Sequence, residues 1–178
     1  MKIVFRIVLL AALAAAGLWL WTVLFPSPQK IIHRQLEAVA RHVSFASNEG
    51  TLARMASAQS LADYFATNVE INLDVPGYAQ HTIVGRDEIT QAALASRSAA
   101  SSLNVKFLDI NVIVDPDTQS ATADLTLDAS ISDQANTIVQ EMKFTLHKIG
   151  GHWLITRVET VRTLSILNFE LRRAPSIV

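Results

Sequence analysis

The second half of the chain alternates between apolar and polar side chains over most of its length. In residues 120–132, which read SATADLTLDASIS, the odd-numbered positions from Ala121 to Ile131 are apolar, and Thr, Asp or Ser lie between them. A period of two residues is typical of a strand with one face buried and the other in water. We therefore expect a long antiparallel sheet, apolar on one side, whose apolar side other elements must cover.

Further long strands are expected on both sides of this segment. Residues 103–115 end at DPDT, a turn sequence with Pro in a favourable position. Residues 137–148, TIVQEMKFTLHK, lead through a turn at Gly150 and Gly151 into residues 152–164, HWLITRVETVRTL. Alternation continues through these segments, so we expect them to extend the same sheet.

Helices and two shorter strands precede this sheet. Residues 31–46 carry apolar side chains four, three and four positions apart, on one helical stripe: Ile32, Leu36, Val39 and Val43. After SNEG we expect a second helix with its own apolar positions: Leu52, Met55, Leu61 and Phe65. Residues 69–75, VEINLDV, then alternate as a strand, and the short stretch HTIVG follows at 81–85. Helices first and strands later are typical of an α+β fold.

The segment GRDEI at residues 85–89 predicts the start of another helix. Gly85 permits the backbone angles of a strand-to-helix corner. Asp87 and Glu88 would lie in the first turn, where the helix dipole favours each negative charge by a few tenths of a kcal/mol. Ile89 would begin the buried stripe. We interpret these residues as structural.

The first thirty residues differ from the rest of the chain. Lys2 and Arg6 are followed by no charged side chain before Lys30, and residues 7–25 are almost entirely apolar. As a helix this segment would span roughly 28 Å, about one bilayer core. Pro26 then begins a short linker that ends the helix. We expect an uncleaved membrane anchor that leaves the domain outside the cytoplasm.

Two alternatives to the uncleaved anchor stay open. A signal peptidase could cut after the small residues Ala14 to Ala16, leaving Gly17 as the new amino terminus. The segment could also be a buried helix of a soluble domain. Lys30, Arg34 and Arg41 follow the apolar segment, so the positive charges only weakly favour a cytoplasmic amino terminus.

Composition excludes several classes of site. The 178 residues contain no Cys, so the chain has no disulfide framework, thiolate metal site or cysteine nucleophile. The 15 Lys and Arg stand against 16 Asp and Glu, and without Lys2 and Arg6 the rest of the chain carries a net charge of −3. An acidic balance argues against nucleic acid as a partner, because phosphate binding needs a basic face.

The order and spacing of these segments resemble the nuclear transport factor 2-like superfamily, particularly its SnoaL-like branch. The resemblance covers residues 31–164, and three stretches carry it: residues 65–69 leading into the first strand, residues 85–89, and residues 151–155, GHWLI. It implies an α+β cone, in which a curved antiparallel sheet packs on amino-terminal helices. Residues 1–30 would then be a cytoplasmic stub, one transmembrane anchor and a Pro linker, and residues 165–178 a tail.

The resemblance implies catalytic positions that this sequence does not fill. Ketosteroid isomerase-like members carry an aspartate base on the first strand, whose counterpart here is Leu73, while alternation directs the neighbouring Asp74 outward. Scytalone dehydratase-like members use paired tyrosines with His and Asp, and the tyrosines here are Tyr64 and Tyr78, the latter in an expected loop. We therefore identify no catalytic residue.

An epoxide hydrolase-like site would need two aspartates and an arginine that converge on a water. Asp124, Asp128 and Arg157 could be neighbours, but alternation places them on the polar outer side of the sheet. The histidines do not form a metal site either, because their spacing scatters them: His33, His42, His81, His147 and His152. We expect no metal or cofactor.

The resemblance implies a mostly apolar pocket inside the cone. Strand residues on the apolar face are its expected lining, and two polar groups are expected beside them: Leu73, Phe107, Leu125, Leu127, Met142, Phe144 and Trp153, with Tyr64 and His81. Small side chains at Ala121 and Ala123 would either admit a helix closely or leave a cavity.

These features favour a membrane-anchored extracytoplasmic module that binds a small apolar ligand or a protein partner. We expect a single-pass protein of the inner (cytoplasmic) membrane with a periplasmic domain, able to form a homodimer through the sheet. The alternative function is a small lyase, isomerase or hydrolase acting on an apolar substrate. An anchor joined to this fold also resembles the inner-membrane assembly component of type IV secretion machines, a family whose members are usually longer.

The anchor makes a direct prediction about the mature chain. The protein should be found in the membrane fraction, and mass determination should give a chain that retains residues 1–26, because the apolar segment is long enough to stay in the bilayer. A soluble product that begins near Gly17 would contradict the anchor and favour a cleaved signal peptide.

Overall fold

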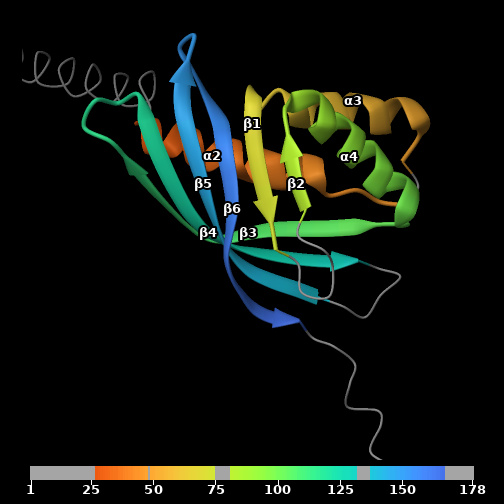
Figure 1. Cartoon of the computed structure of the whole chain (residues 1–178). Helices are drawn as coiled ribbons and strands as arrows, with labels where there is room; N and C mark the ends of the chain where they lie inside the picture. Colours follow the sequence, from red (N-terminus) through yellow and green to blue (C-terminus); the bar gives the residue numbers. More distant parts are fainter. Residues whose placement is uncertain (1–26, 48, 75–80, 132–136, 167–178) are drawn as a thin grey trace, which may run out of the picture.

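The structure is a computed structural model that describes residues 27–47, 49–74, 81–131 and 137–166. Helices precede and interrupt the strands in the described part of the chain (Figure 1). The elements in chain order are α2 (Pro28–Val43), α3 (Thr51–Ala62), β1 (Phe65–Leu73), β2 (His81–Val84), α4 (Arg86–Ala99), β3 (Leu103–Val114), β4 (Ser120–Ile131), β5 (Thr137–Ile149) and β6 (His152–Ile166).

The strands form one six-stranded sheet in the order β2-β1-β6-β5-β4-β3. Neighbours pair antiparallel except β1 and β6, which run parallel with Ile71 opposite Val158. The expectation of a purely antiparallel sheet was therefore wrong. Parallel and antiparallel strands show the same side-chain alternation when one face is buried, so the pattern does not reveal the direction of β1.

Extra residues in two strands bend the sheet. In β3, Leu108 pairs with Thr126 and Asn111 with Asp124, so two residues of β3 stand opposite one residue of β4. Asp109, one of the two, has a φ of 52°. β6 has three such register shifts against β5. Bulges of this kind bend a strand and increase its twist, and Figure 1 shows β3 to β6 turning sharply along their length.

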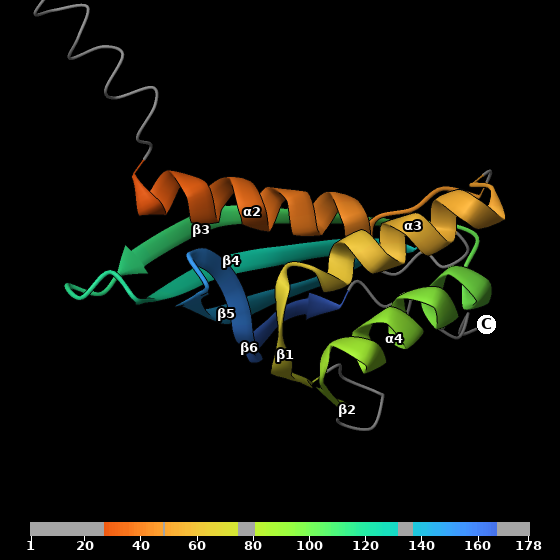
Figure 2. The ribbon, with the colours of Figure 1, turned by 90° about the horizontal axis from the view of Figure 1, so that it is seen from above.

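The helices cover the concave face of the bent sheet. Figure 2 shows α2 lying over β3, while α3 and α4 pack side by side next to β1 and β2. The expected stripe of α2 is confirmed, because Ile32, Leu36 and Val39 are buried. Ala121 and Ala123 are 1% and 0% exposed, so the small side chains allow close packing at the middle of the core.

Two expectations for the second helix were wrong. Leu52 and Met55 were expected on its buried face, but they are 84% and 56% exposed. Phe65 lies in β1, because the helix ends at Ala62. α3 buries small residues and its last turn against its neighbours: Ala58, Leu61 and Ala62. Its apolar residues occur around the helix, so spacing alone did not indicate which side faces the core.

The GRDEI segment forms the expected corner. Gly85 has a φ of 89° and donates its N–H to the carbonyl of Val69 at 2.8 Å. A carboxylate oxygen of Glu88 accepts the N–H of Val84 at 2.8 Å, which closes the first turn of α4. Arg86 donates through Nε to the carbonyl of Phe65 at 3.1 Å. These contacts confirm a structural role for the segment.

The expected anchor, residues 7–25, lies outside the described residues, as do Val75 and Tyr78. Within residues 27–47, 49–74, 81–131 and 137–166, no helix is long and apolar enough to cross a membrane.

The positive φ of Gly85 leads to a stability prediction. Gly85→Val should lower the free energy of unfolding by about 1 kcal/mol or more, because a β-branched residue is strained at this φ. The added Cβ would also lie 3.4 Å from the carbonyl oxygen of Thr67. Denaturant unfolding followed by circular dichroism measures the change.

Gly50 is the matched control. It has a φ of −67°, and nothing lies within 4 Å of an added Cβ. Gly50→Ser should change stability by no more than about 0.5 kcal/mol. Equal losses in the two variants would show that the corner at Gly85 is an ordinary one.

Candidate functional site

A cleft of about 690 Å³ opens where the β5–β6 hairpin meets the start of α2 and the end of α3. We call it the hairpin cleft. Its lining comes from three separate parts of the chain: Pro28, Ile31, Gln35, Asp63, Tyr64, Lys148, Ile149, Gly151, His152, Trp153 and Leu154.

Local sequence explains why the hairpin presents these side chains. Gly150 and Gly151 have φ values of 59° and 84°, the combination that a tight two-residue turn of a hairpin requires and that glycine accepts without strain. The turn ends β5 at Ile149 and starts β6 at His152, so both residues stand at the mouth of the cleft.

Hydrogen bonds hold the three walls of the hairpin cleft together. The Gln35 side chain donates through Nε2 to the carbonyl of Trp153 at 2.9 Å, which joins α2 to β6. The N–H of Ile155 donates to the carbonyl of Tyr64 at 2.9 Å, which joins β6 to the start of β1. The cleft is therefore a preformed feature of the sheet and helices.

The walls of the hairpin cleft are largely apolar and its rim is polar. Ile31 and Ile149 are 41% and 47% exposed, while Trp153 behind them is buried. Asp63, Lys148 and His152 lie exposed at the rim, and no ion pair or hydrogen bond joins them in the part of the chain that the structure describes. An apolar body with one polar end would match this distribution.

The residues expected to line a pocket lie in different places. Tyr64 and Trp153 line the hairpin cleft. Phe107 lies in a separate hollow beside α2, and Leu125 and Met142 back a shallow hollow on the sheet's outer side.

Other members of the expected set lie in or next to the core. Phe144 is 3% exposed and packs edge-to-face on Phe107, with ring centres 5.5 Å apart. Leu73 and Leu127 are half-buried. His81 is the first residue of β2, and its side chain is not among those that the structure describes. Most of the expected lining thus fills the core between the sheet and the helices.

Sequence reasoning missed most residues of the hairpin cleft. Ile31 lies beside the buried stripe of α2 and Ile149 at the end of a strand, and a single exposed apolar residue usually carries no information. An isoleucine directly before Gly-Gly was a usable signal, because a side chain at the tip of a tight turn lies far from the core. Gln35 gave no signal, since its importance comes from carbonyl partners on β6 and at Tyr64, just before β1.

Asp74 is exposed, which agrees with the outward direction that the alternation predicted. Its backbone is held on both sides: its N–H donates to the hydroxyl of Thr160 at 3.3 Å, and its carbonyl accepts from Nε2 of Gln140 at 2.7 Å. Gln140 is 1% exposed and also donates to the hydroxyl of Thr163 at 2.9 Å. This network fixes the end of β1, where Leu73, the expected counterpart of the isomerase base, is half-buried.

The charged residues of the outer side do not converge on a common point. Arg157 pairs with Glu70 at 3.0 Å and with Glu159 at 3.6 Å. Asp124 stands opposite Lys143, and Asp128 opposite Lys106. Hydrogen bonds from Asn72 and, to a smaller extent, from Arg157 lower the pKa of Glu70. The bond between Arg157 and Glu70 raises the pKa of Arg157. This is the expected ladder of solvated charges.

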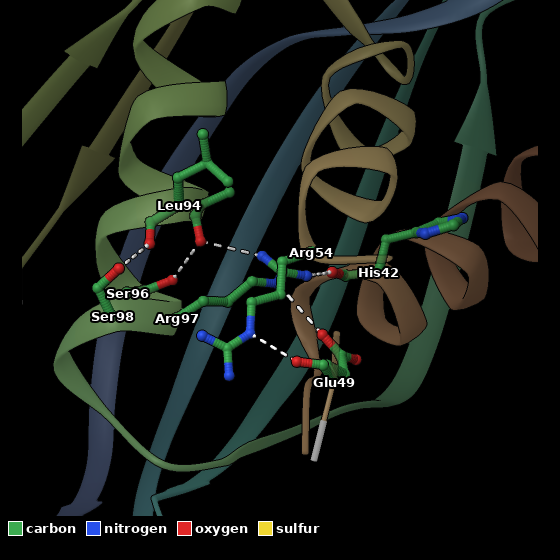
Figure 3. A network of polar contacts seen from close by, with 8 residues as sticks. His42, Glu49, Arg54, Leu94, Ser96, Arg97 and Ser98 are labelled. Carbon is green, nitrogen blue, oxygen red and sulfur yellow. Dashed lines mark hydrogen bonds and ion pairs between the residues drawn. The ribbon is translucent and has the colours of Figure 1, made fainter. Parts of the chain in front are cut away.

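Arg97 is the buried cation of the described part of the chain, with 4% of the residue exposed. Its Nη2 donates to the carbonyl of His42 at the end of α2, at 2.5 Å, and its Nη1 to the carbonyl of Ala93, at 3.0 Å (Figure 3). Its Nε lies 3.7 Å from Oε2 of Glu49. Figure 3 shows the guanidinium of Arg97 between α4, the end of α2 and the segment of Glu49.

The surroundings of Arg97 indicate a structural role. The guanidinium lies 5.2 Å from the ring centre of Phe45, which covers it. Burial lowers the pKa of Arg97, and the Glu49 carboxylate only partly offsets this effect. Through these contacts the guanidinium fastens α4 to the end of α2 and to the segment of Glu49.

The histidines are as scattered in space as in the sequence. His33 lies 3.5 Å from Glu37 one turn later on α2, and the His42 ring lies 5.8 Å from that of Tyr64. His147 and His152 are exposed at the hairpin. Among the residues that the structure describes, no group of three or more His, Asp or Glu side chains could hold a metal ion.

No protein-family model and no curated protein matches the sequence. Solved structures do match. A candidate scytalone dehydratase from Novosphingobium aromaticivorans has a TM-score of 0.58 and 16% identity, covering 80% of this chain and 88% of that one. A nuclear transport factor 2-like protein of unknown function from Pseudomonas putida has a TM-score of 0.56 and 10% identity, covering 74% and 84%.

The yeast UBP3-associated protein BRE5 is similar to the same extent, with a TM-score of 0.56, 16% identity and coverage of 79% and 99%. These likenesses establish the nuclear transport factor 2-like fold: a curved mixed sheet of six strands packed with helices. The neighbours include a candidate enzyme and a protein named for its partner, so the fold is compatible with a cone that binds a ligand.

The buried position of Arg97 leads to a prediction. Arg97→Met should lower the free energy of unfolding by about 2–4 kcal/mol, because it strips the buried carbonyls and Glu49 of their partner. Arg162→Met is the control, since Arg162 pairs with Glu141 at 2.8 Å on the exposed outer side, and it should cost about 1 kcal/mol or less. Urea unfolding measures both, and equal losses would contradict the role of Arg97.

Proposed function

We propose that the chain is a membrane-anchored, extracytoplasmic module of the SnoaL-like branch that binds a small apolar ligand, or an apolar segment of a protein partner, in the hairpin cleft. The hairpin cleft is the observation that carries this proposal. It is large enough for a small molecule, has apolar walls and polar groups at its rim, and is held by hydrogen bonds between three elements.

The place of the hairpin cleft in the chain supports the proposed anchoring. Pro28 lines the cleft and is the first residue of α2, and the apolar segment of residues 7–25 ends just before it. A chain anchored by that segment would hold the cleft close to the bilayer surface. A ligand or partner segment that partitions into the membrane would then reach the cleft without crossing water.

The alternative is a small lyase, isomerase or hydrolase that acts on an apolar substrate. Similarity to a candidate scytalone dehydratase and to a candidate aromatic ring hydroxylase keeps this alternative open. The hairpin cleft contains Tyr64, Asp63 and His152, residue types that such chemistry uses. Binding is the better-supported function, because Asp63 and His152 are both exposed at the rim.

A homodimer through the outer side of the sheet is a compatible addition to either function. Ile113 and Val161 are 56% and 60% exposed, on strands whose outer side carries charges of both signs. A second copy placed across a two-fold axis would pair such charges with one another.

Removing the apolar walls tests the binding function. We expect the full chain, extracted from its membrane in mild detergent, to carry a co-purified small apolar molecule in native mass spectrometry. The double variant Ile31→Asp with Ile149→Asp should lower its occupancy at least about tenfold, because two apolar contacts are lost. Both side chains are partly exposed, so the fold should be unaffected.

Two controls accompany this test. Ile113→Asp changes another partly exposed isoleucine, outside the cleft, and should leave the bound molecule in place. Asp74→Asn should also leave it unchanged, whereas in an isomerase with Asp74 as the base the same change would slow turnover by orders of magnitude. Absence of any bound molecule from the unmodified chain, or its retention by the double variant, would contradict binding in the hairpin cleft.

A further inference from the structure

The outer edge of β3 is partly occupied by the chain itself. β3 is an edge strand, and β4 pairs with its inner side. At its start, the main chain of Phe45 exchanges two hydrogen bonds with Leu103, at 2.8 and 3.0 Å. The Ser44 hydroxyl accepts the N–H of Val105 at 2.9 Å and donates to its carbonyl at 3.2 Å. This edge therefore already accepts an extended segment of chain, in antiparallel orientation.

Further along, the same edge is open. In an antiparallel strand the backbone groups of alternate residues point away from the partner strand, so Phe107 continues the outward series of Leu103 and Val105. Beyond the bulge, the Asp115 N–H donates to the Ser120 carbonyl, so the backbone groups of Asp115 point towards β4. By alternation, the backbone groups of Val112 and Val114 point outward. No hydrogen bond from the described part of the chain reaches the outward backbone groups of Phe107, Val112 or Val114.

Two adjoining hollows run between this open edge and α2. One of about 580 Å³ lies beside residues 104–108, and one of about 460 Å³ lies beside Ile110 and Val112. Glu37 of α2 borders both, so they adjoin, and we call the two together the edge groove. Its floor is apolar, because Phe107, Ile110 and Val112 are half-buried against the core.

The edge groove is basic, although the chain from Lys30 onward is acidic. Three exposed cations of α2 line it, and Glu37 is the anionic side chain among its described lining: Lys30, Arg34 and Arg41. No ion pair joins any of these three to another described residue. The charge of the groove is therefore free to meet a negatively charged partner.

We propose that the edge groove binds an extended, acidic polypeptide segment of another protein as an additional strand beside β3. Backbone groups of the guest would pair with the outward groups of Phe107, Val112 and Val114, continuing the line that Phe45 begins. Apolar side chains on one side of the guest would enter the groove, and acidic ones would face Arg34 and Arg41. About eight residues would match the open part of the strand, from Phe107 to Val114.

Other occupants fit the edge groove less well. A second copy of this chain, paired edge to edge through β3, would bring the same basic side chains together and would be opposed by their repulsion. An anionic bilayer surface would satisfy the cations, but a flat surface cannot use the backbone groups of an edge strand or fill a concave groove. The strand-like contact of Phe45 favours a polypeptide.

Peptide selection tests this proposal. The full chain, held in phosphatidylcholine nanodiscs, is used to select from a phage-displayed library of random peptides about twelve residues long, and selected peptides are synthesised for affinity measurement. We expect the selected peptides to be acidic. The double variant Arg34→Glu with Arg41→Glu should bind them at least about tenfold more weakly, and its affinity should depend less on salt concentration. Lys143→Glu, an exposed change on the outer side of the sheet, should leave affinity unchanged.

N-methylation of the selected peptide distinguishes strand addition from simple charge attraction. Methyl groups on alternate amides should abolish binding in one phase and leave it intact in the other, because only one set of amides would face β3. Failure to select a peptide, selected peptides indifferent to Arg34 and Arg41, or equal effects of both methylation phases would overturn the proposal. Binding of phosphatidylglycerol vesicles, in place of peptides, through the same two arginines would also overturn the proposal. That result would assign the groove to a membrane surface.

Discussion

The bend of the sheet is the constraint on which the rest of the structure depends. Strands of up to 15 residues in one flat sheet would offer a face too broad for three short helices to cover. The extra residues near Asp109 of β3, and those of β6, turn the sheet so that its apolar side closes around the helices. The bend costs conformational energy, and part of that cost lies in the positive φ of Asp109, which Asp tolerates better than most residues.

Two buried polar side chains fix the ends of elements to the core. Gln140 on β5 holds the carbonyl of Asp74, and Arg97 on α4 holds the carbonyl of His42. In both cases the partner lies where an element ends and its backbone groups lack regular partners. A side chain from a distant part of the chain supplies the missing donor, so each end is fixed to the core rather than left to water.

Local pattern predicted the elements better than their arrangement. Strict alternation indicated β4 and β5, and the stripe of Ile32, Leu36 and Val39 indicated α2, because each pattern reports the one face that is buried. The direction of β1 beside β6 leaves no trace in alternation. In α3, apolar residues occur on several sides, and only the packed structure shows that Leu52 faces water.

The candidate site was harder to predict for a related reason. Alternation placed Leu125, Met142 and Phe144 on the concave face correctly, but whether that face borders a cavity or a helix depends on how closely the helices approach. The hairpin cleft joins Ile31, Tyr64 and Ile149 from three separate segments. No local pattern relates such residues, because their contact is a consequence of the finished fold.

The parallel pairing of β1 with β6 also determines when the domain can become complete during synthesis. β1 is made early, but its principal partner is the last strand of the described sheet, so the ribosome must release nearly the whole domain before β1 is paired on both sides. Until then β1 has β2 as its only strand partner in the described sheet. Such long-range closure slows folding and leaves nascent chains prone to association. In this protein, the hairpin of β5 and β6 is the last part of the described sheet to be synthesised. It forms one wall of the hairpin cleft, and its pairing with β1 ends the period in which the nascent chain is prone to association.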